Sequence, residues 1–175
     1  FKGENDMIFI VAQIFGVLGM LFGFISYQNN SHKRIMIMKS LSEGLFAIHY
    51  FLLNSYTGMA MNCIGITRNI VFTYLVLKKK STIPYIVFFS VVMAVVGSFT
   101  WIGWISIFAI FGKICTTVAY GIKDPKWVRF VSVPSCCSWL IYNTYCHSIA
   151  GILTEAFGLA SIIIASIRFK KNNQK

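Results

Sequence analysis

The sequence predicts an all-α integral membrane protein with seven transmembrane helices, arranged as two parallel three-helix bundles joined by an inverting fourth helix. Composition, the placement of basic residues and an internal repeat predict this fold class. The chain of 175 residues is 57% hydrophobic and 12% charged, with a mean hydropathy of +0.69. A soluble domain of this length would need more polar surface to cover its core. The apolar residues instead occur in runs of about 20, the length that spans a bilayer.

Each predicted span is an apolar run bounded by a short polar or basic connection, so no soluble domain is inserted. The first run is too long for a signal peptide, and no small-residue cleavage site follows it. Successive runs are separated either by basic clusters or by the connections "NSYTG", "GSFTWIG" and "CHSIAG", which contain no lysine or arginine. The seven spans, in order, are 7–28, 35–54, 58–77, 84–99, 103–122, 128–146 and 150–169.

These spans predict the following division of the chain. Residues 1–6 are interpreted as an N-terminal addition, with Met7 as the native start. The other units are a first three-helix bundle at 7–80, a linker helix at 81–100, a second three-helix bundle at 101–170 and a cytoplasmic tail at 171–175.

The basic residues predict orientation. The net charge of +11 lies mostly in alternate connections and at the C-terminus, which argues against a nucleic-acid partner. Lysine and arginine are enriched in cytoplasmic loops, so the N-terminus is predicted outside and the C-terminus inside. The Trp residues at span ends (Trp101, Trp104 and Trp127) suit the membrane interface. The basic clusters are Lys33–Arg34, Lys78–Lys80, Lys123/Lys126/Arg129 and Arg168/Lys170/Lys171/Lys175.

The chain matches itself without gaps at an offset of 93 residues. Twelve positions are identical between 14–78 and 107–171, and the span ends coincide. The first three spans therefore match the last three, and the fourth span restores the orientation between them. Parallel repeats of this kind bind solute near the midplane at the repeat interface and work by rocking one bundle against the other.

Four segments carry a resemblance to a known family: "GFISYQ", "HKRIMIMKSLSEGLFAIHYFLL", "TGMAMN" and "TRNIVF". They resemble the YgjV-type family of bacterial inner-membrane proteins, which implies an inner-membrane location. The 3+1+3 arrangement is also similar to the SWEET and PQ-loop superfamily of small-solute transporters, which includes PnuC-type vitamin carriers. The Pro-Gln pair of the PQ-loop families is absent from the first and fifth spans, so their hinge chemistry is not carried over.

The third and seventh spans share a pattern of small and polar residues. Gly58, Asn62, Gly65 and Asn69 fall on one face of the third span. Gly151, Glu155 and Gly158 occupy the matching positions of the seventh. By resemblance to SWEET-like carriers, Asn62 would line the pocket, and Glu155 would replace the second asparagine with a charge. The alternative is that the glycines simply allow close helix packing.

Other ionisable side chains lie deep in the spans. A charge at the bilayer centre costs about 2.5–3.5 kcal/mol on insertion scales, so such residues usually face the bundle interior or water. Two interpretations stay open: a hydrated cavity for a polar or anionic solute, or internal salt bridges. Lys39 and Glu43 are expected to pair locally, four residues apart. The residues expected to bind solute are Glu43, His49, Asn62, Arg68, Asn69, Lys113, Trp139, Asn143 and Glu155.

The leading expectation is a carrier or facilitator for a small polar solute, sugar-, nucleoside-, vitamin- or small-acid-like. A non-transporting receptor or accessory subunit with the same fold is the alternative. No Ser/His/Asp set, HExxH motif or phosphate-binding loop occurs, so neither an enzyme nor ATP-driven transport is expected. The five cysteines form no CxxC pair, and no metal or cofactor is expected. The expected partners are the solute and the lipid bilayer; a homo-oligomer is neither required nor excluded.

Overall fold

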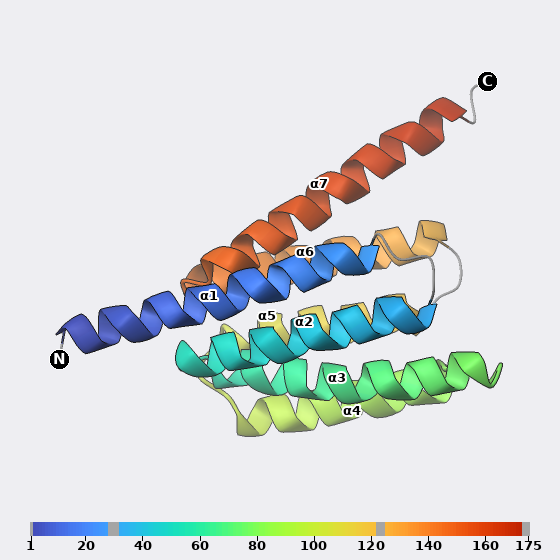
Figure 1. Cartoon of the computed structure of the whole chain (residues 1–175). Helices are drawn as coiled ribbons and strands as arrows, with labels where there is room; N and C mark the ends of the chain where they lie inside the picture. The colour runs from blue at the N-terminus through green and yellow to red at the C-terminus, as the bar shows by residue number, and fades with distance from the viewer. Residues whose placement is uncertain (1, 28–31, 122–124, 173–175) are drawn as a thin grey trace.

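The computed structural model describes residues 2–27, 32–121 and 125–172, with side chains over 6–26, 33–121 and 130–164. Over these residues it contains seven α-helices and no strand (Figure 1). The predicted all-α class and the order of the seven helical segments are confirmed; Gln28, Ile122 and 173–175 lie outside the described part. The helices are α1 Lys2–Tyr27, α2 His32–Leu52, α3 Tyr56–Leu77, α4 Ile83–Phe99, α5 Ser106–Gly121, α6 Pro125–Tyr145 and α7 Ile149–Asn172.

Three described helices are long and apolar enough to cross a membrane: Asp6–Ser26 in α1, Lys33–Leu52 in α2 and Tyr56–Leu77 in α3. Shorter apolar segments are provided by α4, α5 and Ile149–Ile164 of α7. A proline near the start of α4, Pro84, suits the first turn, where its missing N–H has no helical partner.

The turn between α2 and α3 and the turn between α6 and α7 have the same backbone geometry. Asn54 and His147, 93 positions apart, have φ of 55° and 54°. The following Ser55 N donates to Tyr50 O at 2.8 Å, and Ser148 N donates to Asn143 O at 2.9 Å. A positive φ is uncommon outside glycine, so its recurrence at the repeat offset is specific. The sequence repeat is therefore also a repeat of local structure.

The packing of the first two helices of each repeat is also duplicated. Ser42 Oγ donates to Gly19 O at 2.7 Å between α1 and α2, and Ser135 Oγ donates to Gly112 O at 2.8 Å between α5 and α6. A Cβ on Gly19 would lie 3.0 Å from the Phe46 ring, and one on Gly112 would lie 2.8 Å from the Trp139 ring. Both glycines are needed because an aromatic ring of the next helix packs on the backbone there.

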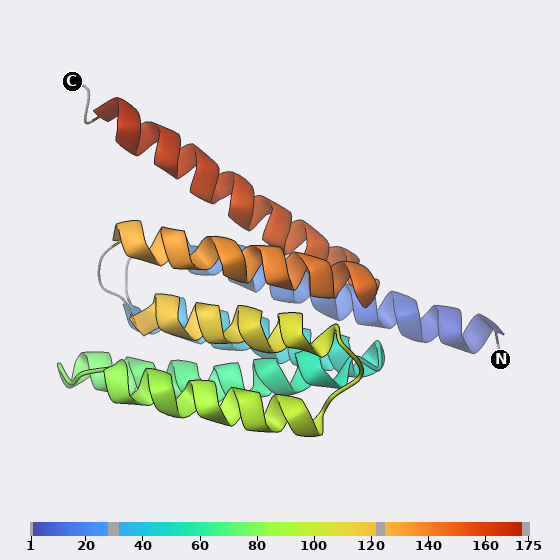
Figure 2. The same cartoon turned by 180° about the vertical axis from the view of Figure 1, so that it is seen from behind.

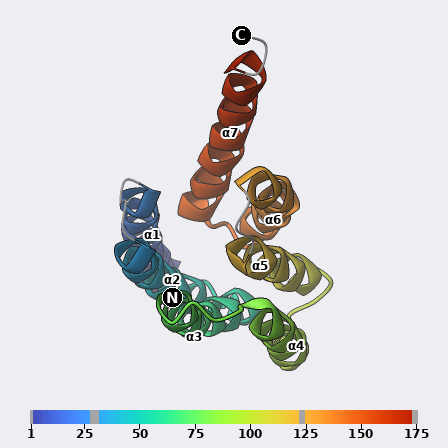
Figure 3. The same ribbon diagram turned by 90° about the vertical axis from the view of Figure 1, so that its right-hand side faces the viewer.

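Six helices form a closed sequence of neighbours. Backbones approach between α1 and α2, α2 and α3, α3 and α5, α5 and α6, α6 and α7, and α7 and α1. Helix α4 lies outside this ring and packs on α3 and α5 (Figure 3). Toward its C-terminus α7 leans away from the other helices (Figures 1 and 2). In the repeat, α3 corresponds to α7 and α1 corresponds to α5. The contact between α3 and α5, here called the α3–α5 seam, is therefore equivalent to the contact between α7 and α1, the α7–α1 seam. Helix α4 covers only the first of these two seams.

The interior combines apolar and polar side chains, and the exterior is apolar. The largest fully buried side chains include the apolar Phe72 and Met61 and also Arg68, His49 and Asn69, whereas Phe99 is 85% exposed and Ile83 is 68% exposed. Ionisable residues inside and apolar residues outside are the arrangement expected in lipid. The buried polar residues therefore define where a functional site lies.

Candidate functional site

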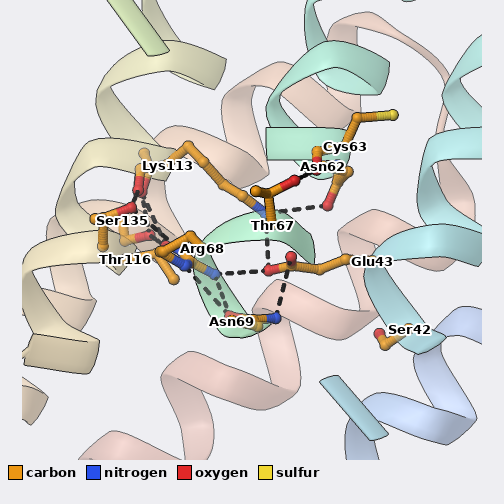
Figure 4. Close-up of polar contacts among 12 residues, drawn as sticks. Ser42, Glu43, Asn62, Cys63, Thr67, Arg68, Asn69, Lys113, Thr116 and Ser135 are labelled. Atoms are coloured by element: carbon orange, nitrogen blue, oxygen red, sulfur yellow. Dashed lines mark hydrogen bonds and ion pairs between the residues drawn. The ribbon is translucent and has the colours of Figure 1, made fainter. Parts of the chain in front are cut away.

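A charged cluster lies at mid-depth where α2, α3 and α5 meet (Figure 4). Glu43 of α2 places Oε1 2.9 Å from Arg68 Nη2 of α3 and 2.9 Å from Lys113 Nζ of α5. Arg68 is fully buried and Lys113 is 4% exposed. Removing ions from water costs several kcal/mol each, and close pairing is what offsets this cost. One carboxylate oxygen therefore holds two buried cations.

Two asparagines of α3 complete the hydrogen bonding of these charges. Lys113 Nζ donates to Asn62 Oδ1 at 3.1 Å, and Asn62 Nδ2 donates to Gly58 O at 2.9 Å. Asn69 Nδ2 donates to Glu43 Oε2 at 3.3 Å, and Asn69 Oδ1 accepts from Arg68 Nη2 at 2.9 Å. Each amide thus accepts from a cation, and Asn69 also donates to the carboxylate.

The far side of Arg68 is covered by α5. Its Nη1 donates to Thr117 Oγ1 at 3.0 Å, and its guanidinium carbon lies 4.6 Å from the centre of the Tyr120 ring. A guanidinium over an aromatic face at this distance gains a cation–π attraction. Arg68 is therefore held by both α3 and α5, and the cluster joins the two helices.

Counting formal charges, the cluster carries Glu43 against Arg68 and Lys113, a net charge of +1. The chain's other carboxylate within the spans is Glu155 of α7. Its carboxyl lies near the Cys136 thiol, and it interacts electrostatically with Lys113 and Lys39. Neither ion pair found among the described side chains includes Glu155. The second carboxylate is thus near the cluster without being paired into it.

A second polar cluster lies nearer the α2–α3 and α6–α7 turns and joins α2 to α6 and α7. Tyr50 Oη donates to Asn143 Oδ1 at 2.5 Å, and these two residues occupy equivalent repeat positions. His49 Nε2 and Ser148 Oγ are 2.7 Å apart. Tyr142, the counterpart of His49, donates to Ser55 O at 3.3 Å and accepts from the Gly58 backbone N–H at 2.8 Å.

Trp139 of α6 lies between the two clusters. It is 7% exposed, its ring stacks on Tyr50 at 5.9 Å, and Lys113 Nζ lies 5.8 Å from its ring centre. It also meets Tyr142 edge to face at 5.6 Å. The indole ring therefore connects the charged cluster to the second polar cluster.

The structure brings most of the predicted site residues together. Glu43, Asn62, Arg68, Asn69 and Lys113 form the charged cluster, and His49 and Asn143 lie in the second cluster, with Trp139 between them. Whether any of them binds solute stays a prediction.

Two details differ from the sequence-based expectations. Lys39 was expected to pair with Glu43, but Glu43 pairs with Arg68 and Lys113, and Lys39 Nζ lies 5.1 Å from the Tyr120 ring centre. Thr117, Tyr50 and Tyr142 were not predicted as site residues. The 93-residue offset could have found the two tyrosines, because they are the counterparts of Asn143 and His49.

Replacing Glu43 by glutamine should destabilise the protein, because two buried cations would lose their shared anion. Breaking a buried pair by removing one partner costs about 3–5 kcal/mol. Thermal unfolding in detergent measures the loss. Adding Lys113→Met should restore part of it, since one cation is then removed. An E43Q protein that unfolds at the parent temperature would contradict this account.

Replacing Gly65 by alanine should disturb the charged cluster, whereas Gly158→Ala should not. A Cβ on Gly65 would collide with Glu43 Oε2 and lie 2.6 Å from Lys113 Cε. On the equivalent Gly158 the nearest atom is Cys136 Sγ at 3.5 Å, an ordinary contact. Overpacking of this kind costs about 1–3 kcal/mol. Equal unfolding temperatures for the two variants would show that the charged cluster can rearrange around the added methyl group without loss of stability, which would contradict this prediction.

Comparison with known proteins identifies the family of the chain. Residues 10–173 match the family Imp-YgjV, described as a bacterial inner membrane protein. The chain is 26% identical over 159 residues to the inner membrane protein YgjV of Escherichia coli (strain K12), covering 91% of this chain and 84% of that protein. None of the solved structures matches at a significant level. The chain therefore belongs to the YgjV-type family of bacterial inner membrane proteins.

Proposed function

We propose that the protein is a carrier or facilitator for a small polar solute in the inner membrane. In this proposal α1–α3 and α5–α7 are two parallel three-helix units joined by α4, as in the 3+1+3 carriers that the sequence resembles. The N-terminus lies outside and the C-terminus in the cytoplasm, as the basic connections indicate. The termini lie at opposite ends of the helices, as an odd number of spans requires (Figure 1).

The charged cluster is the observation that carries this proposal. It lies at mid-depth and joins the two units, with Glu43 and Arg68 in the first and Lys113 in the second. Charges within a membrane are expensive and typically mark solute or ion pathways. The aromatic ring of Trp139 beside Lys113 adds a surface on which a planar solute could stack.

The hydrogen bonds near the turns support a rocking movement. His49–Ser148, Tyr50–Asn143 and Tyr142–Ser55 all cross from one unit to the other. They close one end of the pathway, and each is a single side-chain contact that can break without unfolding a helix. Alternating access needs this combination of rigid units and a breakable contact surface.

A non-transporting receptor or accessory subunit is the second candidate. It is favoured by one observation: Glu43, Arg68 and Lys113 satisfy one another without any solute. In that case the cluster serves to hold the helices together.

Uptake into proteoliposomes tests the proposal once a thermal-shift screen of sugars, nucleosides, vitamins and small acids gives a ligand. Glu155→Gln and Arg68→Ala should insert and fold, because Glu43 keeps Lys113 as its partner. Both should lose uptake by at least about tenfold, the effect of about 1.4 kcal/mol. Leu153→Ala, at an exposed position of the same helix as Glu155, is the matched control. Ligand binding with no uptake by the parent protein would favour the receptor.

A further inference from the structure

Among the described residues, both hydrogen-bond acceptors of the Lys113 ammonium lie in the unit to which it does not belong. Lys113 is on α5, and its acceptors are Glu43 Oε1 on α2 and Asn62 Oδ1 on α3. Arg68 differs, because its acceptors Glu43 and Asn69 belong to its own unit, and only Thr117 belongs to the other. If the two units separate, Arg68 keeps Glu43, whereas Lys113 loses both of its acceptors.

The unit that contains Lys113 also contains an alternative acceptor. Glu155 on α7 is the repeat counterpart of Asn62, and its carboxyl interacts electrostatically with Lys113. Here it does not reach the ammonium, since both ion pairs of the described side chains are made by Glu43.

We infer that Lys113 exchanges partners, pairing with Glu43 in the conformation described here and with Glu155 when α5 moves away from α2 and α3. This inference rests on the two-unit carrier proposed above. After the exchange each unit holds one neutral ion pair, Glu43–Arg68 in the first and Glu155–Lys113 in the second. Without it, separation would leave an unpaired ammonium in the membrane, which is strongly unfavourable.

The exchange makes Glu155 a proton-binding site. While Lys113 is held by Glu43, the Glu155 carboxylate has lost its ion-pair partner, and a proton neutralises it. The titratable groups that face it are the Cys136 thiol of α6, Lys113 of α5, and Lys39 and Tyr50 of α2. Helix α1 presents Phe24 against Phe157. A thiol is a poor ligand for a hard cation such as Na⁺, which requires several oxygens. Acid therefore favours the conformation described here, and proton release favours the exchange.

Spin-label distances between Arg34 and Phe130 test the exchange. Both side chains are exposed, one near the start of α2 in the first unit and one near the start of α6 in the second. Arg34 and Phe130 are each replaced by cysteine for labelling, and Cys63, Cys115, Cys137 and Cys146 are replaced by serine. Cys136 is kept because its thiol faces Glu155, and a protein with Cys136 alone gives the labelling background. The labelled protein is studied in nanodiscs from acid to mildly alkaline pH. We expect longer distances to gain population as the pH rises, because ionised Glu155 then draws Lys113 away from Glu43.

Glu155→Gln should hold the shorter distance at every pH, whereas Glu155→Asp should keep the pH response. Lys113→Met should abolish the response as well, and unfolding temperatures confirm that the variants are folded. A pH response in E155Q equal to that of the parent, or none in the parent, would overturn the inference. If E155Q loses the pH response but the parent protein takes up no solute, the partner exchange is supported and the carrier proposal is contradicted. If the parent takes up solute but E155Q keeps the full pH response, the carrier proposal is supported and the partner exchange is contradicted.

Discussion

The rest of this structure depends on one carboxylate oxygen. Glu43 Oε1 accepts from Arg68 and Lys113 at 2.9 Å each, and through these contacts three helices are joined at mid-depth. In lipid, apolar side chains provide little drive for helices to associate, so packing and polar contacts do this work. Gly65 and the Asn69 amide approach the other oxygen of the same carboxylate, Oε2, and the Asn62 amide accepts from Lys113. Without the carboxylate, Arg68 and Lys113 would keep only the neutral acceptors Asn69, Thr117 and Asn62.

The repeat makes the asymmetry of the cluster informative. The counterparts of Glu43, Arg68 and Lys113 are Cys136, Ser161 and Met20, so the α7–α1 seam has no corresponding charges. There Phe24 meets Phe157 edge to face at 5.7 Å instead. The α3–α5 seam is ionic and also covered by α4, whereas the α7–α1 seam has this aromatic contact and the hydrogen bonds of Gln13 with His147 O and Ile149 N. The two equivalent seams of the repeat are thus held by different interactions.

Much of the fold could be predicted from the sequence, because a membrane span needs a long apolar run and the basic residues lie between such runs. The residues of the charged cluster were identified for the same reason: a buried charge is conspicuous in an apolar segment. Their pairing was not predictable, since Arg68 had Glu43 and Glu155 as candidate partners and no sequence rule measures the distance between helices. Tyr50 and Tyr142 were not predicted because an aromatic residue in a span is ordinary in sequence. Only the structure shows that their hydroxyl groups form hydrogen bonds with helices on the opposite side of the six-helix ring.

In the ring of six helices, α2 and α6 face each other across the centre, and their described backbones do not approach within 8 Å (Figure 3). The space between them is filled by the side chains of Tyr50, Trp139 and Tyr142. The centre between α2 and α6 is therefore closed by aromatic side chains rather than by backbone. In the carrier proposed above, a passage between these helices would open only after the hydroxyl groups of Tyr50 and Tyr142 release Asn143 and Ser55. Opening would thus depend on aromatic rings that are buried and hydrogen-bonded in the conformation described here.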